Sequence, residues 1–106
     1  MGKQAAVINL GSFSSAVAGS TIDIEPRSID RAQVFGFGTF VATWALEVSP
    51  DGGTTWLTAR DINGNDISGL TTAAVRTVSG DATRVRGRVT AFTSGTVQLR
   101  LLPRGD

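Results

Sequence analysis

Three oxygen-bearing side chains at alternate positions, Asp61, Asn63 and Asn65, have the spacing of the first ligands in a calcium-binding loop. The rest of that pattern is missing, because an EF-hand loop needs glycine where this chain has Asp66 and a bidentate glutamate where it has Thr72. Asn-Gly is also an ordinary turn dipeptide. We therefore expect a polar turn without a bound metal, in which Asp61, Asn63, Asn65 and Asp66 are the candidate ligands if a metal does bind.

A row of arginines provides the second possible chemistry. Arg84, Arg86 and Arg88 alternate along one strand-like segment, and Arg100 lies in the segment predicted to pair with it. Such a row could hold phosphates, an anionic glycan or an acidic protein surface, or its stems could cover the sheet with solvated heads. We expect no aromatic side chains between the arginines, which disfavours single-stranded nucleic acid. The planar guanidinium favours an interface with acidic groups of a neighbouring subunit.

Catalysis is the third possibility, and the residue types argue against it. Glycoside hydrolysis needs two carboxylates converging across a cleft, and nothing in the spacing of the acids selects such a pair. The chain has no histidine and no cysteine, and Lys3 is its one lysine, so its serines have no evident activating base. We predict that the protein is not an enzyme and uses no cofactor. The nine acids are Asp23, Glu25, Asp30, Glu47, Asp51, Asp61, Asp66, Asp81 and Asp106.

The octapeptide SPDGGTTW (49–56) has the spacing of an Asp-box, the hairpin motif that sialidase-type propellers repeat once per blade. Its Ser49 and Asp51 side chains can bond the turn backbone, Gly53 permits positive φ, and Trp56 can close the hairpin from the core side. One copy in a chain of 106 residues cannot build a propeller. We therefore predict that Ser49, Asp51, Gly53 and Trp56 form a structural hairpin tip.

Length and charge narrow the class of protein. A chain of 106 residues is long enough for one domain with its own core, and without cysteines that domain has no disulfides. A formal net charge of +1 creates no strong field towards nucleic acid or membrane, so neither is an expected partner. The N-terminal segment has no long apolar stretch typical of a signal peptide, and no segment is long enough to span a membrane.

The hydrophobic pattern has a period of two almost throughout, which predicts strands. Two hairpins are expected, over 41–59 and over 82–102, the second with its turn at 93–95. Gly36 and Gly38 indicate that an aromatic ring or a backbone packs closely against one face of their strand. The predicted strands cover residues 4–10, 20–26, 31–40, 41–48, 54–59, 73–80, 82–92 and 96–102.

Seven or eight short strands with regular turns predict an all-β fold, a single antiparallel β-sandwich of the jelly-roll or immunoglobulin-like type. Residues 21–106 form the sandwich in this interpretation, and residues 1–20 form an N-terminal strand or an extended arm. The apolar side chains of Val7, Ile8, Leu10 and Phe13 could anchor such an arm on the sheet of a neighbouring subunit. An ordinary first strand followed by a long loop is the alternative.

Two segments resemble small β-sandwich virion proteins of tailed bacteriophages. These are WALEVSPDGGTTWLTA (44–59) and ATRVRGRVTAFTSGTVQLRLL (82–102), and the resemblance covers about residues 41–102. The virion proteins combine a strand, an S-x-D-G-G-x-T-W turn and a second strand with an R-V-R-V-T-A-x-T-S-G-T-V segment near the C-terminus. The chain departs from that pattern at Gly87, where a larger residue is expected, which puts the packing beneath Arg86 and Arg88 in doubt.

The resemblance implies a non-enzymatic virion structural protein, made in the host cytoplasm. Its expected role is capsid decoration: a homo-oligomer, with a trimer favoured, that binds the major capsid protein and cements the lattice. A tail or adaptor component is a variant of this role. A carbohydrate-binding or host-adhesion module is the main alternative and requires Trp44, Trp56 or the phenylalanines to present an open stacking face. A calcium-dependent adhesion domain built on residues 61–66 is the third.

Overall fold

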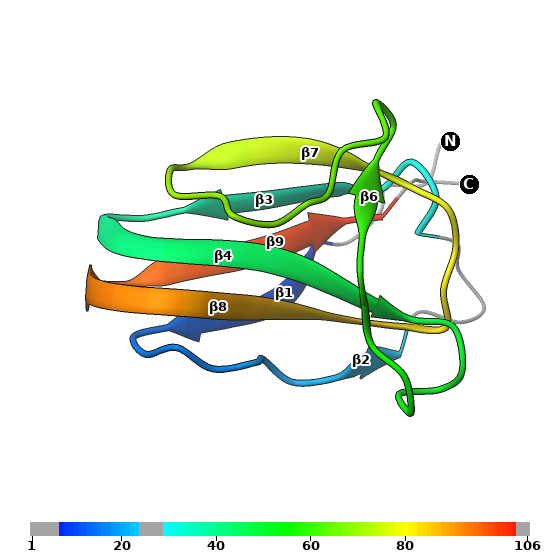
Figure 1. The fold of residues 1–106 in the computed structure, drawn as a ribbon, viewed down its shortest axis with the longest axis horizontal. Helices are drawn as coiled ribbons and strands as arrows, with labels where there is room; N and C mark the ends of the chain where they lie inside the picture. The colour runs from blue at the N-terminus through cyan, green and yellow to red at the C-terminus, as the bar shows by residue number, and fades with distance from the viewer. Residues whose placement is uncertain (1–6, 24–28, 104–106) are drawn as a thin grey trace.

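The structure, a computed structural model, describes residues 7–23 and 29–103, and these residues form a sandwich of two antiparallel sheets (Figure 1). One sheet has five strands in the order β1-β9-β3-β7-β6, and the other has four in the order β2-β8-β4-β5. The all-β sandwich predicted from the period-two pattern is therefore confirmed. The strands are β1 Ile8–Phe13, β2 Ile22–Asp23, β3 Gln33–Phe37, β4 Phe40–Ser49, β5 Leu57–Thr58, β6 Arg60–Asp61, β7 Ala74–Ser79, β8 Arg84–Gly95 and β9 Val97–Leu102.

The pairing of the strands identifies the sandwich as a jelly roll. With the two-residue β6 set aside, β1 pairs with β9, β2 with β8, β3 with β7 and β4 with β5. This is the pairing of one long antiparallel hairpin that is wrapped around itself into two sheets. In an immunoglobulin-like sandwich the first two strands share a sheet, whereas here β1 and β2 lie in different sheets. The jelly roll is thus the correct one of the two predicted sandwich types.

The predicted C-terminal hairpin is wrong, although both of its strands exist. β8 pairs with β4 and β2, while β9 pairs with β1 and β3, so the turn near Gly95 carries the chain from one sheet to the other. Val85 and Val89 of β8 and Leu99 of β9 are all buried, because each faces the core between the two sheets. Gly87 belongs to this contact, since a Cβ there would lie 2.7 Å from Leu99 Cδ1. The missing side chain at this position makes room for the facing sheet.

The core lies between the sheets and is centred on Trp44 of β4. The indole is fully buried, and its Nε1 donates a hydrogen bond to the Thr72 carbonyl at 3.1 Å. A Cβ on Gly36 would lie 2.6 Å from Trp44 Cε2, and a Cβ on Gly38 would lie 2.5 Å from the Thr96 carbonyl oxygen. The sequence prediction that a ring or a backbone packs against these two glycines is confirmed. Other large buried side chains are Leu10, Ile29, Val34, Leu46, Ile67, Val78, Val85, Val89, Val97, Leu99 and Leu101.

The N-terminal segment is part of the sandwich. β1 covers Ile8–Phe13 and pairs with β9 of the same chain, while the first part of the predicted strand 4–10 lies outside the described residues. Leu10 and Phe13 are buried in the core. Residues 17–19 then run along β8, where the Val17 carbonyl accepts from Val89 N and Gly19 N donates to the Gly87 carbonyl. For residues 8–19 the free arm is therefore wrong and the ordinary first strand is the better description.

The segment after β5 closes one side of the sandwich. The predicted return strand 54–59 is reduced to two residues, because the chain crosses at Ala59 to the five-stranded sheet and pairs there as β6 with β7. It then returns to β4, where Leu46 N donates to the Ile67 carbonyl and Trp44 N to the Leu70 carbonyl. The predicted strand 20–26 is described only over β2, since residues 24–28, with Glu25, lie outside the described residues. Residues 7–23 and 29–103 contain no helix that could cross a membrane.

Candidate functional site

The hairpin tip between β4 and β5 is organised by two side chains. The buried Ser49 hydroxyl donates to Asp51 Oδ1 at 2.8 Å and accepts from Gly53 N at 2.8 Å. Asp51 Oδ1 also accepts from Thr55 N at 2.8 Å. Hydrogen bonds from the backbone and hydroxyl of Thr55, and then from Ser49, lower the pKa of Asp51 from 3.8 to about 2. Gly52 and Gly53 have φ values of 76° and 101°, which glycine adopts readily. The side chains of Ser49 and Asp51 are thus used to hold a tight turn.

Trp56 does not close this hairpin from the core, as the sequence prediction had it. Its ring lies over the guanidinium of Arg86, with Arg86 Cζ 4.2 Å from the ring centroid, on the outer face of the four-stranded sheet. Trp56 lies outside because the outer face of this sheet carries the ion pair of Arg86 with Glu47, which are opposite each other on β8 and β4. The indole covers this ion pair rather than the core. An aromatic ring therefore does interleave with the arginine row, contrary to expectation, but Arg86 covers one of its faces.

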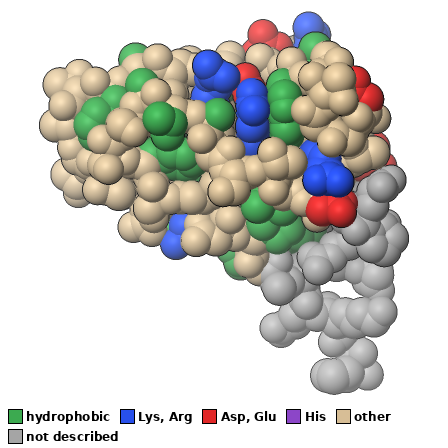
Figure 2. Space-filling view, turned by 90° about the horizontal axis from the view of Figure 1, so that it is seen from below, with side chains coloured by type: hydrophobic (Ala, Val, Ile, Leu, Met, Phe, Trp, Pro, Cys, Tyr) green, Lys and Arg blue, Asp and Glu red, His purple; other side chains and the backbone are tan. Residues whose placement is uncertain are grey.

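The arginine row is largely engaged by carboxylates of its own sheet. Arg86 Nε donates to Glu47 Oε1 at 2.7 Å, Arg88 Nη1 lies 3.7 Å from the same oxygen, and Arg84 Nε lies 4.0 Å from Asp23 Oδ1. In the view of Figure 2, arginine side chains are interspersed with acidic and hydrophobic ones and form no continuous basic surface. Three arginines share two acids, so this face carries only a small excess of positive charge.

Arg100 does not belong to that row. It lies on β9 in the five-stranded sheet, so its side chain points out from the opposite side of the sandwich. The prediction that Arg100 extends the row followed from the predicted β8–β9 hairpin, and it is wrong for the same reason. Alternation along β9 places Arg100 correctly on an outer face, but that face belongs to the other sheet.

The loop with the candidate metal ligands is built around the buried carboxylate of Asp61. Asp61 Oδ1 accepts from Asn63 N at 2.9 Å and Asn65 N at 3.0 Å, and Asp61 Oδ2 lies 4.0 Å from Arg76 Nε. Asp66 lies 3.4 Å from Arg60 Nε. Among the described residues, no three His, Cys, Asp or Glu side chains gather closely enough to hold a metal ion. In this geometry Asp61 acts as the acceptor that shapes the turn.

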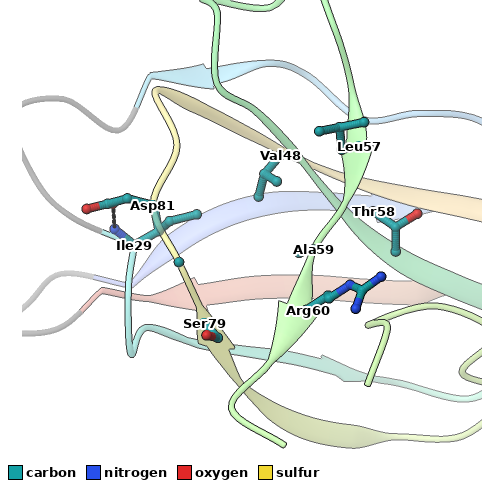
Figure 3. Close-up of a pocket in the computed structure, with 9 residues that line it drawn as sticks. Ile29, Val48, Leu57, Thr58, Ala59, Arg60, Ser79 and Asp81 are labelled. Atoms are coloured by element: carbon teal, nitrogen blue, oxygen red, sulfur yellow. Dashed lines mark hydrogen bonds between the residues drawn. The ribbon is translucent and has the colours of Figure 1, made fainter. Parts of the chain in front are cut away.

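A groove opens at one end of the sandwich, between the turn after β7 and the chain crossing from β5 to β6 (Figure 3). Its cavity has a volume of about 260 Å³. Asp81 supplies its one lining carboxylate, and Oδ1 of that group accepts from Ile29 N at 3.0 Å. The described lining thus lacks the pair of carboxylates that glycoside hydrolysis needs. The lining residues are Ile29, Val48, Leu57, Thr58, Ala59, Arg60, Ser79, Gly80 and Asp81.

A further surface, which we call the Phe37 face, is formed by Phe35, Phe37, Val75, Gln98 and Arg100 on the outer side of β3, β7 and β9. Phe35 is opposite both Val75 and Arg100, and Phe37 is opposite Gln98, so the five side chains are neighbours on one side of the sheet. The two phenylalanine rings stack with centroids 5.9 Å apart. Phe37 is 36% exposed and Val75 is 57% exposed.

Arg100, on the β9 side of this face, is ordered by contacts with its neighbours. Its Cζ lies 5.3 Å from the centroid of the Phe37 ring. Its Nη1 donates to Asn9 Oδ1 and its Nη2 to Gln98 Oε1, both at 3.0 Å. The sequence does put Phe35 and Phe37 on the face opposite the buried Val34, which is an unusual place for two large aromatics. The outward position of these two phenylalanines and of Val75 is the sequence signal for this surface. The sequence does not indicate that β3, β7 and β9 are neighbours.

Comparison with known proteins identifies no relative of this chain. No protein-family model, no curated protein and no solved structure matches the chain. The Phe37 face, the arginine row and the end groove therefore have to be judged on their own contacts.

Proposed function

We propose that this protein is a non-enzymatic structural subunit that works by binding other proteins, and that it decorates the capsid of a tailed phage as an oligomer. The observation that carries the proposal is the Phe37 face. Exposed Phe37 and Val75 share this face with an arginine that is already ordered by Asn9 and Gln98. Aromatic and arginine side chains dominate the buried centres of protein interfaces.

The virion setting is supported by the resemblance of residues 41–102 to small phage virion proteins. Jelly rolls occur in viral capsid proteins and in lectins, so the fold is compatible with this setting and does not select it. The proposed partners are further copies of the chain, with a trimer favoured, and the major capsid protein. A tail or adaptor protein is the partner in the variant of the proposal.

The carbohydrate-binding alternative is less well supported by the contacts. Trp44 is fully buried, Arg86 lies over one face of Trp56, and Arg100 lies near the ring of Phe37, which is 36% exposed. A sugar that stacks on an aromatic ring needs an open ring face. The described aromatic side chains that reach the surface thus favour a protein partner over a glycan.

The test is co-sedimentation with capsids of the phage that encodes the protein, prepared without it. We expect saturable binding at a fixed ratio of protein to capsid subunits. Val75→Asp should abolish that binding, because it places a charge within the Phe37 face. Val41→Asp is the matched control, since Val41 is 59% exposed on the other sheet. Wild-type protein that leaves capsids unbound, or Val75→Asp protein that binds as well as Val41→Asp protein, would refute the proposal.

A further inference from the structure

The Phe37 face carries one charge, that of Arg100, and the hydrogen-bond acceptors of this arginine among the described residues are all neutral. We propose that this face binds a carboxylate set among apolar side chains on a different protein, and that it does not pair with itself. The inference rests on the proposed function, which makes this face the binding surface. It adds the chemistry of the partner and the kind of contact.

The hydrogen bonds of Arg100 leave a defined pair of donors. Nη1 donates to Asn9 Oδ1 at 3.0 Å and to the Leu99 carbonyl at 3.5 Å, and Nη2 donates once, to Gln98 Oε1. A guanidinium has five N–H donors. The Nε–H and one Nη2–H therefore have no acceptor among the described residues. The two oxygens of a partner's carboxylate can accept from these donors.

The apolar surroundings determine what the partner must supply. Contact with a protein would bury the guanidinium together with Phe35, Phe37 and Val75, and burying an unpaired charge is strongly unfavourable. A carboxylate that accepts from the unused donors of Arg100 removes that cost, and the excluded water strengthens the pair. A partner with only apolar or amide groups at this point would leave the charge uncompensated. The complementary surface is therefore an Asp or Glu side chain with apolar neighbours.

Charge also argues against a second copy of the chain as the occupant of this face. A twofold contact brings the same patch of each copy together, so Arg100 would face Arg100 with no described carboxylate between them. The outer face of the four-stranded sheet is no better, because Glu47 already engages Arg86 and Arg88, and Arg84 accompanies Asp23. A twofold contact through the Phe37 face, or a contact between this face and the outer face of the four-stranded sheet, is therefore unfavourable, which favours a different protein as the occupant.

The inference can be tested with two synthetic peptides and isotope-labelled protein. One peptide has a glutamate between leucine and phenylalanine, and the other has glutamine at that position. Amide resonances of β3, β7 and β9 should shift with the glutamate peptide, which should bind at least about tenfold more tightly than the glutamine peptide. In Arg100→Gln protein the two affinities should become equal. Val41→Asp protein should behave as wild type.

Several outcomes would overturn the inference. These are equal binding of the two peptides to wild-type protein, shifts centred on Arg84, Arg86 and Arg88, and a glycan that binds wild-type protein but not Val75→Asp protein. Self-association in sedimentation that Val75→Asp abolishes would show that the face pairs with itself. The peptide comparison uses wild-type protein, so it stands even where a variant folds poorly.

The capsid experiment separates this inference from the proposed function. Capsid binding that Arg100→Gln leaves unchanged would reject the carboxylate partner and keep the decoration role. A preference for the glutamate peptide without any capsid binding would reject the decoration role and keep the chemistry of the face.

Discussion

Individual residues in this protein are defined as much by missing side chains as by present ones. Gly36 has no Cβ because the Trp44 ring occupies that space, while Gly52 has open space around it but a φ of 76°. The first glycine is required by packing and the second by backbone conformation. The two positions therefore respond differently to the same substitution.

Gly36→Ala should lower the free energy of unfolding by about 1–3 kcal/mol, because the added methyl group overpacks against Trp44. Gly52→Ala should cost about 1–2 kcal/mol through backbone strain alone. Urea unfolding measures both, and fluorescence in a Trp56→Phe background separates the causes. The Trp44 emission should change in Gly36→Ala protein and stay as in the parent for Gly52→Ala protein. Equal Trp44 spectra in the two variants would contradict the packing argument.

Asp51 should make stability depend on acid pH. Folding lowers its pKa from 3.8 to about 2, so the carboxylate contributes stability well above pH 3.8 and loses that contribution as the pH falls towards and below 2. The difference in unfolding free energy between wild type and Asp51→Asn should therefore be largest near neutral pH and should shrink through this window. Thermal or urea unfolding over a pH series measures it. A difference that does not vary with pH would show that the Asp51 charge is not stabilised by the hairpin.

At the scale of elements, the pairing of β1 with β9 makes the N-terminal segment part of the fold rather than an arm. Alternation along residues 8–13 is interrupted between Asn9 and Gly11, where the register with β9 shifts, so Leu10 and Phe13 both reach the core. A bulge of this kind cannot be read from a period-two pattern. The small residues between the apolar ones are compatible with an arm as well as with a first strand, so the sequence left both open.

Leu10→Ala should destabilise the protein by about 2–5 kcal/mol, because it removes a fully buried side chain between the sheets. Val7 is the matched control, since it is 52% exposed, and Val7→Ala should change stability by no more than about 0.5 kcal/mol. Urea denaturation of both variants measures the difference. Two equally small effects would mean that β1 is not an integral strand.

For the whole molecule, the arrangement of β8 and β9 in different sheets is the decisive feature. It separates Arg100 from Arg84, Arg86 and Arg88 and produces two chemically different outer faces. One face has arginines engaged by acids, and the other has one arginine among aromatic and aliphatic side chains. The proposed partner of the Phe37 face depends on this separation.

Paired cysteines test this arrangement directly, because the chain has no cysteine of its own. Ser12 and Gln98 are opposite each other across β1 and β9, and opposed Cα atoms are about 4.5–5.5 Å apart, within reach of a disulfide. The Ser12→Cys, Gln98→Cys protein should therefore oxidise to a disulfide. Thr90→Cys with Gln98→Cys should keep free thiols, because these residues lie on different sheets, whereas a β8–β9 hairpin would pair them. Thiol titration after oxidation distinguishes the two arrangements.

The sequence by itself determined which residues of the regular strands face inwards, because burial of one side of a strand imposes a period of two on its side chains. That was sufficient for the all-β sandwich, for the positions of most strands, for the core role of Trp44 and for the close packing at Gly36. Only the tertiary structure decided which strands are neighbours, because a buried valine on β8 is equally satisfied by a partner in its own sheet or across the core. The jelly-roll pairing, the place of Arg100, the outward position of Trp56 and the whole of the Phe37 face follow from that choice.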